Sequence, residues 1–204
     1  MKSTITKKSN VEILNLFRKN IFLSRTIREI ALMAKKDYPT VYNAIKELEA
    51  TRILQTKRAG HAKLCTISLT NNAVSILSFL DEQEALSKAL PNTDKIMEFK
   101  DFEDDILLIT GSYAKGTQTR QSDMDFVIIA KDKAFEKQKL LESLTALFLP
   151  KIHPIVITYK DFMDMLLEKK ASFGKEIFNN RLLLRNASRY YLLLKEAMEN
   201  GFRG

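Results

Sequence analysis

The sequence predicts an α+β protein of two parts: three helices closed by a β-hairpin, followed by a small α/β domain. Two observations indicate this division. Helical periodicity, followed by two apolar stretches around a basic turn, occupies roughly the first 70 residues, and two short apolar strands flank a Gly-Ser pair further on. The length of 204 residues suits one large domain or two small ones.

The charge is concentrated in the first part. Residues 1–80 carry 14 Lys and Arg against 5 Asp and Glu, net +9, whereas residues 81–204 carry 19 against 20, net −1. This asymmetry indicates that the first part meets a polyanion, or that it is a solvated basic surface.

The composition excludes several classes of protein. A hydrophobic fraction of 45% and a charged fraction of 28% are ordinary for a globular chain, so disorder is not expected. One cysteine excludes an internal disulfide framework. No run of about 18 apolar residues is present, and the first ten residues lack the apolar core of a secretory signal. We expect a soluble cytoplasmic protein that does not enter a membrane.

Helical signals come first along the chain. Apolar residues recur at helical spacing over residues 10–19. Thr26 and Glu29 have the spacing of a capping box that opens a second helix. Pro39 fits the first turn of a third helix, with Asp37 or Tyr38 as its cap. The expected core side of this third helix carries Val41, Ala44, Ile45 and Leu48.

A hairpin follows the third helix. Its strands are Ile53–Thr56 and Leu64–Leu69, and Gly60 lies near the tip of the basic turn. We expect Cys65 to be a small buried thiol in the second strand. Across residues 8–70, and most closely in PTVYNAIKELEATRILQTKRAG, the chain resembles the winged helix-turn-helix family.

That resemblance implies double-stranded DNA as a partner, with the third helix in the major groove and the hairpin as a wing. Base-edge or phosphate contacts would come from Thr40, Tyr42, Asn43 and Lys46, and wing contacts from Lys57, Arg58, His61 and Lys63. The alternative is a module for protein docking or dimerisation. We place this domain at residues 1–70.

Residues 71–90 form the expected connection. Asn71 or Asn72 can cap a helix that runs to about Ala89, and Pro91 ends it. Its apolar side is interpreted as a dimerisation arm, which would make a homodimer, or as a surface that packs on the second domain; it consists of Val74, Ile76, Leu77, Phe79 and Leu80.

The second domain, residues 91–204, holds the pattern that carries chemistry. A short strand, Ile106–Thr110, ends at Gly111-Ser112, where a glycine lets backbone approach a phosphate and a hydroxyl can bind it. Asp123 and Asp125 are two residues apart at the start of the next strand, so both side chains lie on one face. Two adjacent carboxylates repel unless a cation lies between them, and Mg²⁺ prefers carboxylate and phosphate oxygens.

This pattern resembles the DNA polymerase beta-like nucleotidyltransferase superfamily, and most closely its minimal branch. The resemblance implies a small mixed sheet with helices on one side and transfer of a nucleoside monophosphate from an NTP, with ATP as the expected donor. It implies Mg²⁺ or Mn²⁺ on Asp123 and Asp125, with Ser112 in the same catalytic set. The nucleotide-binding residues it implies are Gly111, Ser112, Gly116 and Ser122.

One expected residue of that superfamily, a third carboxylate on a later strand, has no counterpart. In the candidate strand, residues 151–159, alternation directs His153 and Ile155 toward the aspartate pair, and no Asp or Glu lies between Glu142 and Asp161. Three interpretations follow: His153 is the general base, another chain or the C-terminal helix donates an acid, or the site binds nucleotide without efficient turnover. An ordinary strand histidine is the plain alternative.

The rest of the domain is interpreted as scaffold. A helix is expected over Phe135–Leu147, a strand over Arg181–Arg185 and a C-terminal helix whose Tyr190 and Tyr191 lie in the core. Three hypotheses for the whole chain follow: a nucleotidyltransferase fused to a DNA-binding domain, a regulator that senses nucleotide, and an adaptor for a protein partner. The acceptor would be a protein, a small molecule or a nucleic-acid end.

Overall fold

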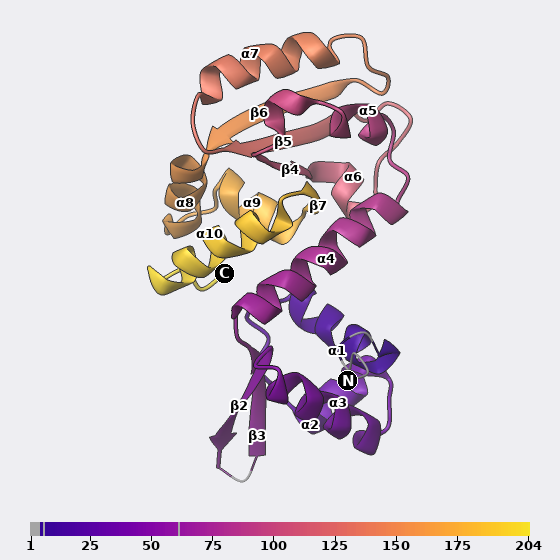
Figure 1. Cartoon of the computed structure of the whole chain (residues 1–204), viewed down its shortest axis with the longest axis vertical. Helices are drawn as coiled ribbons and strands as arrows, with labels where there is room; N and C mark the ends of the chain where they lie inside the picture. The colour runs from indigo at the N-terminus through magenta and orange to yellow at the C-terminus, as the bar shows by residue number, and fades with distance from the viewer. Residues whose placement is uncertain (1–4, 6, 61) are drawn as a thin grey trace. The chain divides into compact units, whose positions relative to one another are not determined.

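The computed structural model describes residue 5 and residues 7–60 and 62–204, which divide into two compact units, Met1–Leu77 and Ser78–Gly204 (Figure 1). The division falls inside helix α4 (Asn71–Ser87). Within the described residues, no helix has the length and apolarity needed to cross a membrane.

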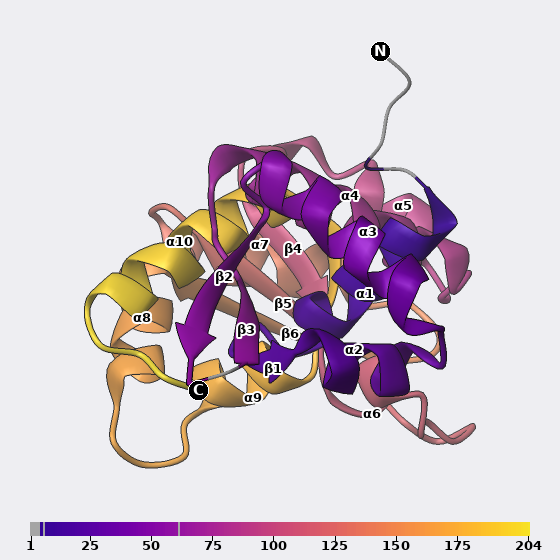
Figure 2. The same ribbon diagram turned by 90° about the horizontal axis from the view of Figure 1, so that it is seen from below.

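The first unit has a winged-helix layout, with three helices and a three-stranded antiparallel sheet in its described residues. The hairpin of β2 and β3 extends beside the helices of the same unit (Figure 2). The short strand β1, which the sequence did not predict, adds to β3 on the other side, giving the order β1-β3-β2. The elements are α1 (Lys8–Lys19), β1 (Arg25–Thr26), α2 (Ile27–Ala34), α3 (Tyr38–Ala50), β2 (Leu54–Ala59) and β3 (Ala62–Ile67).

The helix starts of this unit follow from local hydrogen bonds. The Thr26 hydroxyl accepts from the Glu29 amide, and the Glu29 carboxylate accepts from the Thr26 amide, which confirms the capping box. Asp37 is the cap of α3, because its Oδ1 accepts from the Thr40 amide at 2.9 Å. The predicted core side of α3 is confirmed: its members are all buried, namely Val41, Ala44, Ile45 and Leu48.

Helix α4 differs from the predicted apolar side at Phe79, and Ile76 is only partly buried. Val74, Leu77 and Leu80 are buried as expected, but the Phe79 side chain is 55% exposed. The predicted apolar side extends further around α4 than the neighbouring residues cover, so Phe79 lies outside the core.

The second unit is built on a mixed four-stranded sheet in the order β6-β5-β4-β7. β5 and β6 are parallel, and β4 is antiparallel to both β5 and β7. The strands are β4 (Ile106–Ile109), β5 (Met124–Ala130), β6 (Ile152–Thr158) and β7 (Leu182–Arg185). The helices are α5 (Thr93–Met97), α6 (Gly111–Lys115), α7 (Ala134–Thr145), α8 (Tyr159–Leu167), α9 (Phe173–Asn179) and α10 (Ala187–Glu199), with a 3₁₀ turn at Lys100–Phe102.

Helices cover both faces of this sheet, so the expectation of helices on one side is wrong. Leu107 and Ile109 of β4 belong to the same core cluster as Leu141 of α7. Ile106 and Leu108 point to the opposite face, which α8 and α10 contact, and they are also fully buried. Figure 1 shows α7 on one side of the sheet and α8, α9 and α10 on the other. A strand buried on both faces explains the uninterrupted apolar sequence of β4.

The C-terminal segment completes the second unit. Tyr190 and Tyr191 of α10 are fully buried, which confirms their placement in the core. The Arg181 guanidinium lies 4.6 Å from the centre of the Tyr190 ring, and the Tyr191 hydroxyl donates to the Asp81 carboxylate. The helices α5 and α9 were not predicted from the sequence.

Candidate functional site

The turn after β4 brings backbone and carboxylate together. Gly111 has a φ of +67°, in the left-handed region that favours glycine. A Cβ atom placed on Gly111 would lie 2.1 Å from Oδ2 of Asp125. Residue 111 must therefore be glycine for two reasons, its conformation and the carboxylate that lies against its backbone.

The pairing of β4 with β5 fixes the position of Asp125. Ile109 pairs with Phe126, and the Thr110 amide donates to the Asp125 carbonyl at 3.0 Å. The Asp125 side chain is 34% exposed, so its carboxylate lies at the surface of the turn. Asp123 lies in the exposed residues just before β5, separated from Asp125 by the buried Met124. In the described part of the chain, no group of three or more His, Cys, Asp or Glu side chains is close enough to hold a metal ion.

The other predicted nucleotide-binding residues lie on α6 and the loop behind it. Ser112 is in the first turn of α6, and its carbonyl accepts from the Thr117 amide at 3.0 Å. Gly116 ends α6 with a φ of +71°. The Ser122 hydroxyl accepts from the Thr119 amide at 2.9 Å, so it already closes the loop that leads to Asp123.

His153 takes the place next to Asp125 on the neighbouring strand. The parallel register pairs the two residues, and His153 Nδ1 lies 3.1 Å from Asp125 Oδ1. Asp161 is engaged elsewhere, because its Oδ2 accepts from the amide and the hydroxyl of Thr158 in the capping box of α8. Hydrogen bonds from Thr158 lower the pKa of the Asp161 carboxyl.

The predicted DNA-contacting residues of α3 are brought to one exposed side. Asn43 and Lys46 are exposed, and Thr40 and Tyr42 are partly exposed. The Lys46 ammonium lies 4.8 Å from the centre of the Tyr42 ring, and the rings of Tyr38 and Tyr42 stack with their centres 6.0 Å apart.

The wing residues flank the hairpin. Lys57, Arg58 and Lys63 are all exposed, and Arg58 pairs with Lys63 across the hairpin. His61, also predicted to contact DNA, lies outside the described residues.

A hollow of about 590 Å³ lies between the predicted DNA-contacting residues of α3 and those of the wing. Tyr42 of α3 and Lys63 of the wing both line it, so it lies between the helix and the hairpin. Sequence reasoning missed Arg28 and Tyr38 in its lining; Tyr38 could have been found because it lies one helical turn before Tyr42. The full lining is Thr26, Ile27, Arg28, Tyr38, Tyr42, Ala62 and Lys63.

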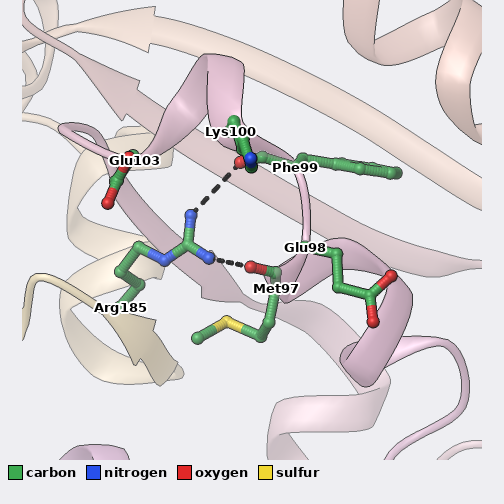
Figure 3. A pocket seen from close by; sticks show the side chains of 6 residues that line it. All are labelled: Met97, Glu98, Phe99, Lys100, Glu103 and Arg185. Carbon is green, nitrogen blue, oxygen red and sulfur yellow. Dashed lines mark hydrogen bonds between the residues drawn. The ribbon is translucent and has the colours of Figure 1, made fainter.

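A second cavity, of about 580 Å³, lies in the other unit (Figure 3). Arg185 reaches into it and donates to the carbonyls of Met97 and Phe99, so its guanidinium is bound to backbone. Arg185 pairs with Leu107 of β4, whereas Gly111 follows the opposite end of that strand. The cavity is lined by Met97, Glu98, Phe99, Lys100, Glu103 and Arg185, none of which belongs to the Gly111–Asp125 site.

Comparison with known families finds a match within the second unit. Residues 90–183, which contain β4 to β6 and the Gly111–Asp125 turn, match the family model "Nucleotidyltransferase domain". The match covers less than half of the 204 residues, and it makes this segment similar to nucleotidyltransferase domains. Within the matched segment, Asp125 lies against the Gly111 turn, and His153 lies beside it on β6, the strand on which the resemblance implies a third carboxylate.

Comparison with solved structures finds a DNA-binding domain, a transcription regulator and a chromatin protein, all at low similarity. The homodimeric winged helix-turn-helix DNA-binding domain of a Mycobacterium bovis protein is 15% identical, with 43% of this chain and 75% of that chain covered and a TM-score of 0.34. MepR, a transcription regulator of Staphylococcus aureus, is 17% identical, with coverage of 45% and 72% and a TM-score of 0.32. The archaeal chromatin protein TrmBL2 is 13% identical, with coverage of 94% and 97% and a TM-score of 0.23. A comparison with curated protein sequences finds no match.

Proposed function

We propose that the protein transfers a nucleoside monophosphate from an NTP to an acceptor, with Asp123 and Asp125 as metal ligands. The observation that carries this proposal is the contact between the Asp125 carboxylate and the glycine turn within a nucleotidyltransferase domain. The same turn offers backbone and the Ser112 hydroxyl to a phosphate chain, next to the acid that would hold the cation.

The donor set fits a divalent cation. Asp125 has one oxygen against Gly111 and the other toward His153, and its side chain is accessible. Asp123, exposed two residues earlier, is the second acid that we propose for the same ion, although among the described residues it forms no three-residue metal-binding group with Asp125 and His153. When bound, the cation would neutralise charge that develops on the phosphates.

In the reaction that we propose, an acceptor oxygen attacks the α-phosphorus of the NTP. The bond from that phosphorus to the bridging oxygen of the β-phosphate breaks, and pyrophosphate leaves with the electron pair, while the acceptor hydroxyl releases its proton to water. Gly111, Ser112, Gly116 and Ser122 would hold the triphosphate in place, and the aspartates would hold the cation. ATP is the donor to test first.

One observation favours a second candidate function, nucleotide sensing without efficient turnover. His153 rather than a carboxylate lies beside Asp125, and the nearest later acid, Asp161, is bound in a helix cap. An NTP bound at such a site would act as a signal rather than as a substrate.

Incubation with α-labelled ATP, Mg²⁺ or Mn²⁺ and cell lysate distinguishes the two candidates. Label transferred to an acceptor by the wild type, and lost in Asp123→Asn and Asp125→Asn, supports transfer. Asp132→Asn, an exposed aspartate just after β5, is the matched control and should retain it. If ATP binds saturably but no label is transferred, the result supports sensing. If the protein neither binds ATP nor transfers label, both candidate functions are contradicted.

We also propose that the first unit binds double-stranded DNA. Support comes from its net charge and from the exposed basic residues on α3 and the wing around one hollow. Affinity for duplex DNA, measured by gel shift, is expected to fall steeply as salt rises, because bound cations are released from the phosphates. Binding that does not depend on salt would contradict phosphate contacts and favour a protein partner. This proposal places the protein in the cytoplasm, with its DNA and NTPs.

We also propose that the protein forms a homodimer through α4. Phe79 and Leu86 of α4 are 55% and 61% exposed, and their spacing of seven residues places them on one side of the helix. Light scattering of the full chain is expected to give a dimer mass that falls in a Phe79→Ser/Leu86→Ser variant. A monomeric wild type would contradict the dimerisation role of α4.

A further inference from the structure

His153 Nδ1 and Asp125 Oδ1 form a hydrogen-bonded pair whose spacing also equals that of two neighbouring metal ligands. Two ligands at neighbouring octahedral positions, each about 2.1 Å from an ion, lie about 3.0 Å apart. Asp125 Oδ1 and His153 Nδ1 are 3.1 Å apart. The backbone holds this spacing, since the two residues are partners in the parallel register of β5 and β6.

Both partners are accessible to an ion from solvent. The His153 side chain is 62% exposed and that of Asp125 is 34% exposed. The other oxygen of Asp125 is fixed against Gly111, so the carboxylate presents Oδ1 on the side of the imidazole. An incoming cation therefore meets one nitrogen and one oxygen at the same place.

A mixed nitrogen and oxygen pair discriminates between cations. Mg²⁺ prefers an octahedron of oxygen ligands, whereas imidazole nitrogen suits first-row transition metals. A carboxylate at position 153 would remove this preference and leave an all-oxygen site.

We propose that His153 is a metal ligand and that, with Asp125, it makes the site selective for Mn²⁺ over Mg²⁺. This inference rests on the proposed nucleotidyl transfer, because it names the cation of the same site. Asp123, the phosphates of the nucleotide and water supply the remaining ligands, and no third side chain needs to be in place beforehand. His153 then replaces the missing third carboxylate as a ligand rather than as a proton acceptor.

Mn²⁺ binding to the full chain, followed by electron paramagnetic resonance, tests this inference. The wild type is expected to bind Mn²⁺ with at least tenfold preference over Mg²⁺, measured by displacement. His153→Ala is expected to weaken Mn²⁺ binding at least tenfold, and His153→Asp to bring the two affinities within threefold of each other. Electron spin echo spectra of bound Mn²⁺ should show nitrogen coupling in the wild type and none in His153→Asp.

Two controls separate the failure of this inference from that of the proposed function. His61, the second histidine of the sequence, is replaced in His61→Ala, which is expected to keep the nitrogen coupling. Asp125→Asn is expected to abolish Mn²⁺ binding. If it does so while His153→Ala leaves binding and selectivity unchanged, His153 is no ligand but the aspartate site stands. If Asp125→Asn binds Mn²⁺ like the wild type, or if the wild type binds none, the metal site of the proposed function fails as well.

Discussion

The Asp125 carboxylate occupies the space that any side chain on Gly111 would need, since a Cβ there would lie 2.1 Å from Oδ2. Gly111→Ala must therefore displace Asp125, and it also strains a backbone with a φ of +67°. We expect at least a hundredfold loss of nucleotide transfer or, for a sensor, of nucleotide binding. Thermal unfolding is expected to show a stability loss of about 1–3 kcal/mol.

Gly116→Ala is the matched control for that prediction. Gly116 has a similar φ of +71°, but a Cβ there meets nothing within 4 Å. The control therefore carries the backbone strain without the displaced carboxylate, and it is expected to lose stability but far less function than Gly111→Ala, even though Gly116 is itself a proposed nucleotide-binding residue. Equal functional losses in the two variants would show that strain, and not the position of Asp125, matters.

Lys137 of α7 stabilises a buried carboxylate. The Asp105 side chain is 1% exposed and pairs with the Lys137 ammonium, while its Oδ1 has no hydrogen-bond partner among the described residues. Lys137→Ala leaves this charge unpaired in the interior, so we expect chemical denaturation to show a loss of about 3 kcal/mol. Lys139→Ala, an exposed lysine of the same helix, is expected to change stability by no more than about 0.5 kcal/mol. A similar effect of both substitutions would contradict the role of the buried pair.

Cys65 is expected to resist alkylation in the folded protein. It is fully buried in β3, and burial raises the pKa of its thiol to about 11. Only the thiolate reacts, and at pH 8 a thiol with this pKa is ionised in about one molecule per thousand. The iodoacetamide reaction, followed by mass spectrometry, is expected to be at least a hundredfold slower in native protein than in urea and to accelerate as the pH approaches 11. Equal rates in the two conditions would contradict the burial of Cys65.

The proposal that the first unit binds DNA predicts that DNA binding can be weakened without loss of ATP binding. Lys46→Ala on α3 and Arg58→Ala on the wing are each expected to weaken duplex binding and to reduce the slope of log affinity against log salt by about one. ATP binding is expected to stay unchanged in both variants. Lys131→Ala, an exposed lysine just after β5, serves as the control and should leave DNA binding intact. Simultaneous loss of DNA and ATP binding in Lys46→Ala would contradict a separate DNA-binding surface.

Local signals in the sequence predicted much of the fold. The capping box at Thr26, the Asp37 cap and the apolar strand Ile106–Ile109 each depend on neighbouring residues, so they can be recognised without tertiary structure. Strand alternation also places His153 on the face of Asp125, where the structure has it.

Features that depend on distant contacts could not be predicted in the same way. Strand β1 is two residues long and exists only because it pairs with β3. The exposure of Phe79 depends on which part of α4 the rest of the unit covers. The turn at Gly111 was recognised from its residue types, but the contact that makes glycine obligatory appears only when β4 and β5 are paired.

Thr110, the residue before Gly111, donates its hydroxyl to the Asn180 carbonyl at 2.6 Å. The segment that matches the nucleotidyltransferase family ends at residue 183, in the middle of β7, whereas the buried Tyr190, Tyr191 and Leu194 come after it. The segment that matches the family model is therefore shorter than the compact unit in which it lies, Ser78–Gly204. A fragment excised at residue 183 would keep the hydrogen bond between Thr110 and Asn180 but would lose α10, which packs against β4, so that face of the sheet would be uncovered.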